Sequence, residues 1–176
     1  MSANSPTARD CRAFDDGAAA VEFALLLPLF VMLVFGIISG GFTFDRWIGV
    51  TQSAREASRF AATYPVDPSN MNQWYLDVAN TAAEGAGITI GTTDPTTYFI
   101  CVAFRRSSTE TAAAPPDGMA TYGTLSTASG SCDGSTVDEN RVEVLIKRSS
   151  AFDWVLGGST LAVTGSNTSR YEPRLT

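Results

Sequence analysis

The stretch "DDGAAAVEFALLLPLFVMLVFGIISGGF", from Asp15 to Phe42, decides the architecture of this chain. No residue from Phe23 to Phe44 is charged. At about 1.5 Å per residue, a helix over this run would be roughly 33 Å long, which is enough to cross the hydrocarbon core of a bilayer. The run therefore predicts a transmembrane segment at residues 23–44. A buried helix of a soluble protein is the less favoured alternative, because buried helices of this length and uniformity are rare.

Two features inside the run bear on function. Gly36 and Gly40 form a small-xxx-small pair, which would let a second helix approach closely, although ordinary membrane-helix glycines fit equally well. Glu22 lies just inside the start of the run, five residues after Gly17. A carboxylate at the edge of a membrane segment is costly and is therefore a candidate functional residue; the alternative is an interfacial side chain solvated by headgroups.

The helical pattern continues past the membrane segment, in "RWIGVTQSAREASRFAA" from Arg46 to Ala62. Apolar residues recur there at spacings of three and four, which is one helix face: Trp47, Val50, Ala54, Ala57 and Ala61. Pro65 limits the helix, since a residue before proline disfavours the α region. We expect one helix over residues 18–62, roughly 65 Å long, whose outer half offers a stripe for a domain to pack on.

Composition disfavours several functions. The net charge of −6 argues against a nucleic-acid partner, because nothing neutralises a row of phosphates. The chain has no histidine, and therefore lacks the commonest general base and metal ligand. We expect a protein that is not an enzyme, with no cofactor and no metal site. An acidic surface turn is favoured over a calcium site for the cluster Asp133, Asp138 and Glu139, because its spacing does not match an EF-hand loop.

Residues 63–176 predict a small α+β domain. "DPSNMNQWYLDVANTAAEGAG" reads as a second helix, capped by Asp67 with Pro68 at the first helical position, and ended by Gly85 and Gly87. One face of this helix is apolar: Met71, Trp74, Tyr75, Val78 and Ala82. "YFICVAF", "RVEVLIKR" and "STLAVTGSNTSRY" read as strands of an antiparallel sheet, and "GITIG" as a further short strand. Residues 107–136, rich in Ser, Thr, Ala, Gly and Pro, read as a long surface loop.

The three cysteines divide across the predicted membrane segment. Cys11 precedes it, whereas Cys101 and Cys132 follow it. A disulfide between Cys101 and Cys132 is favoured over a metal site, because two cysteines without histidine make a weak zinc case. By the chain-entropy model, closing about 30 residues would contribute roughly 3–4 kcal/mol.

The N-terminal region resembles the TadE-like family, pilin-like minor proteins of bacterial tight-adherence (Flp, type IVb) pilus systems. The resemblance rests on "GAAAVEFALLLPLFVMLVFGI", with Gly17 five residues before Glu22 and Phe23, followed by "VTQSAREASRFAA". It covers Gly17 to Ala62 well and returns more loosely in "VEVLIKR" and "LAVTGSNTSRYEP".

The resemblance implies a cut after Gly17 by a prepilin peptidase on the cytoplasmic face, so that residues 1–17 are a leader. Glycine would let the peptidase approach that bond closely. The cut would free the amine of Ala18, and Glu22, four residues later, would share a helix face with it. In pilin-like assemblies such an acid is thought to neutralise the amine of its own or a neighbouring subunit. Asp15 and Asp16 stand where leaders of this kind usually carry Lys or Arg.

The implied function is that of a minor pilin or pseudopilin that supports assembly of a tight-adherence pilus and surface adhesion. The implied partners are the prepilin peptidase, the inner-membrane assembly proteins, other pilin-like subunits and membrane lipid. The implied location is the bacterial inner membrane, crossed once, with a cytoplasmic N-terminus and residues 63–176 periplasmic or extracellular. The alternative is an unprocessed single-pass protein whose outer domain binds or senses a ligand, a role for which residues 107–136 would be available.

Overall fold

The computed structural model describes residues 10–67, 69–107, 118–125, 132, 139–154 and 157–172, and the side chains of these residues except for 10–16 and 151–159. Its elements in chain order are α1 (Asp10–Thr63), α2 (Met71–Gly85), a 3₁₀ turn (Pro95–Thr97), β1 (Tyr98–Arg105), β2 (Gly118–Tyr122), β3 (Arg141–Trp154) and β4 (Gly157–Arg170). A long apolar helix, a second helix and a four-stranded antiparallel sheet confirm the predicted α+β class.

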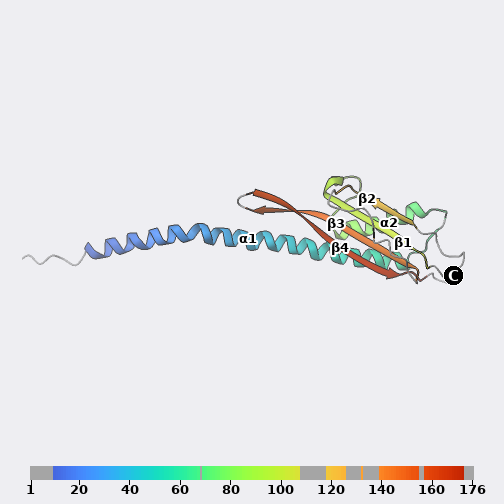
Figure 1. Cartoon of the computed structure of the whole chain (residues 1–176), viewed down its shortest axis with the longest axis horizontal. Coiled ribbons are helices and arrows are strands. Elements are labelled where there is room, and N and C mark those ends of the chain that lie inside the picture. The colour runs from blue at the N-terminus through green and yellow to red at the C-terminus, as the bar shows by residue number, and fades with distance from the viewer. Residues whose placement is uncertain are drawn as a thin grey trace, which may run out of the picture.

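Helix α1 is the long axis of the molecule (Figure 1). It runs unbroken through Pro28 and ends at Thr63, two residues before Pro65. It begins at Asp10, before the predicted start at residue 18, so it includes the last residues of the predicted leader. Adding a residue to an existing helix costs far less than starting one, which explains why the helix extends past the apolar run.

The sheet has the strand order β2-β1-β3-β4, and every neighbouring pair is antiparallel. β3 pairs with β1 from Tyr98↔Arg148 to Arg105↔Arg141, and with β4 from Arg141↔Arg170 to Trp154↔Gly157. β3 is therefore longer than its pairing with β1. The β3–β4 hairpin consequently continues alone past the rest of the sheet, and Figure 1 shows this extension running alongside the middle of α1.

The core lies between one face of the sheet and the two helices. The sheet contributes alternate positions of its central strands: Ile100, Val102, Phe104, Val142, Val144 and Ile146. Helix α2 buries the predicted face, with Trp74, Tyr75, Val78, Ala79, Ala82 and Ala83 all buried and Met71 packed at its edge. Phe104 is central, because its ring lies 6.2 Å from that of Trp74 and 5.1 Å from that of Tyr171.

Three local predictions were wrong. "GITIG" forms turns, because the chain after α2 is folded into hydrogen-bonded turns such as Thr93 N to Thr89 O. Strand β2 lies within residues 107–136, which were predicted to be loop throughout. Asp67 does not cap α2, whose N-cap is Asn70 without a side-chain bond; instead Asp67 accepts hydrogen bonds from the backbone and hydroxyl of Ser69.

Candidate functional site

The predicted processing position lies on the exposed N-terminal part of α1. Gly17 is helical and exposed, and a Cβ built on it meets no atom within 4 Å. Its backbone does not have a positive φ, so the fold itself does not require glycine at this position. Ala18, Glu22 and Phe23 are also helical and exposed, Phe23 with 66% of its surface accessible.

Ala18 and Glu22 are one helical step of four residues apart, so they share a face of α1, as the sequence predicted. Nothing within the described part of the chain covers this face. The arrangement can therefore bring a carboxylate close to an amine created at Ala18, or close to an amine of another chain. Whether cleavage occurs at Gly17 stays a prediction.

Among the described residues, most of the large apolar side chains of the uncharged run are exposed. Within the part of the chain that the structure describes, the run belongs to the one helix that is long and apolar enough to cross a membrane. The most apolar 18 residues of this helix have a mean hydropathy of 2.6, and none of them is buried. Large apolar side chains are exposed on every side of the helix, including Leu25 at 75%, Leu29 at 68% and Ile37 at 67%. An all-round apolar surface is what lipid accommodates and water does not.

The predicted helix-packing glycines lie on the same run. Gly36 and Gly40 lie on the exposed run, and a Cβ built on Gly40 meets no atom within 4 Å. The chain itself therefore places no helix against this pair. A close helix contact here would have to come from another molecule, and it stays a prediction.

The outer half of α1 is held tightly by the domain. Gly165 of β4 approaches so closely that a Cβ on it would lie 2.7 Å from the carbonyl oxygen of Val50. About two turns further along α1, Asn167 Nδ2 donates to Ser58 Oγ at 2.6 Å, and Ser58 itself is fully buried. These contacts fix the strand against the helix from Val50 outward.

Two arginines lie where the domain meets the uncharged run. Arg46, two residues beyond Phe44, donates from Nη1 to Ser150 Oγ of β3 at 3.2 Å. Arg148 donates to the carbonyl oxygen of Ala86. Burial, and secondarily the charge of Arg46, lower the pKa of Arg148, which places the two guanidinium groups within each other's field. Among the described side chains neither arginine forms an ion pair; the salt bridge found there joins Arg170 to Glu139 at 3.6 Å.

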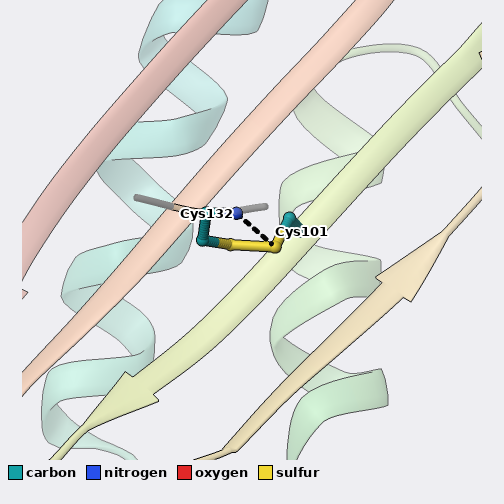
Figure 2. The surroundings of a disulfide bond; sticks show 2 residues. All are labelled: Cys101 and Cys132. Carbon is teal, nitrogen blue, oxygen red and sulfur yellow. Dashed lines mark hydrogen bonds between the residues drawn. A yellow bond between two sulfur atoms is a disulfide. The ribbon is translucent and has the colours of Figure 1, made fainter. Parts of the chain in front are cut away.

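The structure joins Cys101 and Cys132 by a disulfide, with Cα atoms 5.9 Å apart (Figure 2). Cys101 lies in β1, on the sheet face opposite the helices, where Phe99 and Ala103 are also buried. The backbone N–H of Cys132 donates to Cys101 Sγ at 3.2 Å, and both residues are fully buried. Cys132 is thereby attached to the centre of the sheet.

No cluster of three or more potential metal ligands occurs within the described residues. Of the acidic cluster considered for calcium, Asp133 and Asp138 lie outside the described residues. Glu139 is exposed and pairs with Arg170, which is a surface interaction of the kind expected for an acidic turn. Cys11 lies in α1, but its side chain is outside the described set.

Sequence reasoning missed the reach of the β3–β4 hairpin and its attachment at Arg46. A signal was present: two β-rich runs flank Gly157 and Gly158, and glycine pairs between such runs are typical of hairpins. Only the pairing register shows that the hairpin outruns its neighbours and lies beside the helix.

Comparison with known proteins gives one match. Residues 17–59 match the family model described as TadE-like protein, which is the family that the sequence motif resembles. The match begins at Gly17 and covers most of α1, roughly a quarter of the 176 residues. Neither the curated proteins nor the solved structures contain a match to the chain.

Proposed function

Because residues 17–59 match the TadE-like family model, we propose that this protein is a membrane-anchored, pilin-like minor subunit of a tight-adherence pilus system. The observation that carries the proposal is the start of the match at Gly17, the residue at which the motif predicts cleavage. The family is a pilus-associated structural family, which accords with a role in assembly rather than catalysis.

The geometry supports this proposal in two ways. Most of the large apolar side chains described on the apolar half of α1 are exposed, and this half is therefore available first to lipid and then to neighbouring subunit helices. The other half of α1 is the spine of the α+β domain, because Val50, Ala54 and Ala57 are buried under the sheet. A single rigid helix thus links an anchor to a folded head, which is the architecture that pilin-like assembly requires.

In this function a prepilin peptidase cuts after Gly17, and the new amine of Ala18 meets Glu22 of its own or a neighbouring chain. The charge pair offsets the cost of placing Glu22 at the membrane edge. Partners are then the peptidase, inner-membrane assembly proteins and other pilin-like subunits. The N-terminus faces the cytoplasm, and the domain lies outside the inner membrane.

The test is the intact mass of the full chain, purified from bacterial membranes with and without a co-expressed prepilin peptidase. We expect the peptidase to remove residues 1–17. Gly17→Val should abolish the cut without disturbing the fold, because an added side chain meets nothing there. Gly41→Val is the matched control: Gly41 is an equally open glycine of the same helix, and this variant should be cut normally.

An uncut chain in the presence of an active peptidase, shown by cleavage of a known substrate, would reject the processed subunit. The single-pass protein with an outer binding domain would then be the remaining function. Glu22→Gln separates the two roles of the motif: we expect normal cleavage but loss of co-purification with other pilin-like subunits.

A further inference from the structure

The β3–β4 hairpin has a fixed position along α1. The hydrogen bond from Arg46 to Ser150 places Ser150 level with the first charges after the uncharged run, Asp45 and Arg46. β3 then continues to Trp154, in register with β4 as far as Trp154↔Gly157. Four further strand residues at about 3.3 Å each extend the hairpin by roughly 13 Å beyond Arg46.

The direction of this extension follows from contacts further along β4. Gly165 lies against Val50, and Asn167 bonds to Ser58, so β4 runs in the same direction as α1. The other end of the hairpin must therefore lie beside residues that precede Arg46 (Figure 1). A length of 13 Å corresponds to about nine helical residues, which brings the hairpin end level with Ile37 to Asp45.

The chemistry at this level is that of a membrane interface. On α1, Phe44 and Trp47 are exposed at 58% and 47%, and their rings lie 5.7 Å apart. On the hairpin, positions 151–154 are Ala, Phe, Asp and Trp, and Leu161 is exposed at 49%. Tryptophan is enriched where a protein passes the lipid headgroups, because its ring is apolar and carries a polar N–H, and arginine there can face lipid phosphates.

We propose that the end of the β3–β4 hairpin, with Phe44, Arg46 and Trp47 of α1, sits in the outer headgroup interface of the bilayer that α1 crosses. This inference needs α1 to span a bilayer but does not depend on the pilus function. Arg46 then faces lipid phosphates, a favourable site for a cation without an acidic partner among the described residues.

The interface, rather than the hydrocarbon core, is the depth that the backbone permits. Open strand edges carry unpaired N–H and C=O groups, which hydrocarbon cannot satisfy, and Asp153 would add a charge. The last turns of the uncharged run are also its most polar part, since Ser39 and Thr43 lie there with Gly40 and Gly41 between them. The bilayer core is thereby centred on the more N-terminal part of the run, and the hairpin end meets the headgroups.

The function of such a contact is to fix the orientation of the domain. A helix alone allows the domain to rotate and tilt above the membrane, whereas a second point of contact removes that freedom. The face of the domain presented to assembly partners is then constant while the subunit waits in the membrane.

The test uses the full chain with Cys11→Ser in lipid nanodiscs, spin-labelled at single introduced cysteines. The disulfide occupies Cys101 and Cys132, so these residues do not take the label. Trp154→Cys and Ser159→Cys report on the hairpin end. Ser159 pairs with Phe152 in the register, and its substitution leaves Phe152 and Trp154 in place. Leu29→Cys is the lipid control, and Thr168→Cys, exposed on the domain part of β4, is the water control.

Collisions with dissolved oxygen are compared with collisions with a water-soluble nickel complex. We expect the ratio of oxygen collisions to nickel-complex collisions at positions 154 and 159 to be several-fold higher than at position 168 and lower than at position 29. This ratio should stay constant as lipid is added in excess. A ratio at 154 and 159 equal to that at 168 overturns the proposal. If the labels at 154 and 159 are shielded from the nickel complex only until the protein is diluted in lipid, the proposal is also overturned, because a second copy of the chain then covers the hairpin.

Discussion

The two halves of α1 are both apolar, yet one half is exposed and the other is buried against the domain. From Phe23 to Phe44 most side chains are large and apolar, and these are exposed on every side of the helix, as with Leu25 at 75%. From Val50 to Ala61 the apolar surface is a narrow stripe in which Ala54, Ala57 and Ala61 are completely buried. Small residues on one stripe let a sheet approach the helix closely, whereas large residues on all sides require lipid. The width of the apolar surface and the size of its side chains, rather than hydrophobicity alone, therefore decide what each half contacts.

The largest expected difference in stability is between a Phe→Ala substitution in the domain core, which covers the outer half of α1, and the same substitution on the exposed half of α1. Phe104→Ala should lower the free energy of unfolding of the domain by about 3–5 kcal/mol, because a fully buried ring in contact with Trp74 and Tyr171 leaves a cavity. Phe42→Ala, on the exposed run, should leave it almost unchanged. Denaturant unfolding of the full chain in detergent measures both. Equal losses of stability for the two variants would contradict the separation of the exposed run of α1 from the domain core.

The cysteines provide the next contrast. Replacing Cys101 and Cys132 together by Ser should destabilise the domain by about 3–4 kcal/mol, since the bond closes a separation of 31 residues. Cys11→Ser should have no effect on domain unfolding, because Cys11 lies on the other side of the uncharged run from both. Thermal unfolding of the two variants under non-reducing conditions gives the comparison. A wild-type chain whose unfolding is unchanged by a reductant would argue against this stabilising role.

A smaller loss of domain stability is expected from a substitution where the sheet meets the backbone of α1. Gly165→Ala places a Cβ against the carbonyl of Val50 and the Cα of Thr51, which are backbone atoms that cannot rotate away. Overpacking of this kind costs about 1–3 kcal/mol. Gly41→Ala, at an open position on the uncharged half of α1, is the control and should not alter the domain. A Gly165→Ala protein as stable as wild type would show that helix and strand separate easily.

Local periodicity was enough to predict most of the elements. α2 and its buried face followed from the spacing of Trp74, Tyr75 and Val78, and β1 from a short apolar run. Strand β2 escaped because "GMATY" lies among Ser, Thr and Gly and its pairing with β1 is set by tertiary contact. Trp47 fits the apolar stripe by spacing but is 47% exposed, because the buried part of the stripe begins at Val50.

The site could be predicted where a local motif carries it, and not where it depends on distant pairing. Gly17 and Glu22 were identified from a local motif and its resemblance to the TadE-like family, and their roles stay predictions. The contact between Arg46 and Ser150 joins residues 104 positions apart and has no local signature. The same holds for Gly165, whose proximity to Val50 follows from the sheet's position on the helix and not from any neighbouring residue.

The smallest expected effect is a pH dependence confined to the domain half. The backbone N–H of Thr96 and, secondarily, its hydroxyl donate to Asp94, and these bonds lower the pKa of Asp94 from its usual 3.8. A lowered pKa in the folded state means stability that is present above about pH 4 and lost as the pH falls through the folded value. Asp94→Asn retains an N-cap acceptor without the titration. Its thermal unfolding temperature should therefore lie slightly below that of wild type at pH 7 and fall less steeply between pH 5 and about pH 2.5, so that the two proteins converge in acid. If the unfolding temperatures of the two proteins fall equally steeply in acid, Asp94 contributes nothing to this pH dependence. Asp67, whose pKa is lowered mainly by the hydroxyl of Ser69, would then be the next carboxylate to replace.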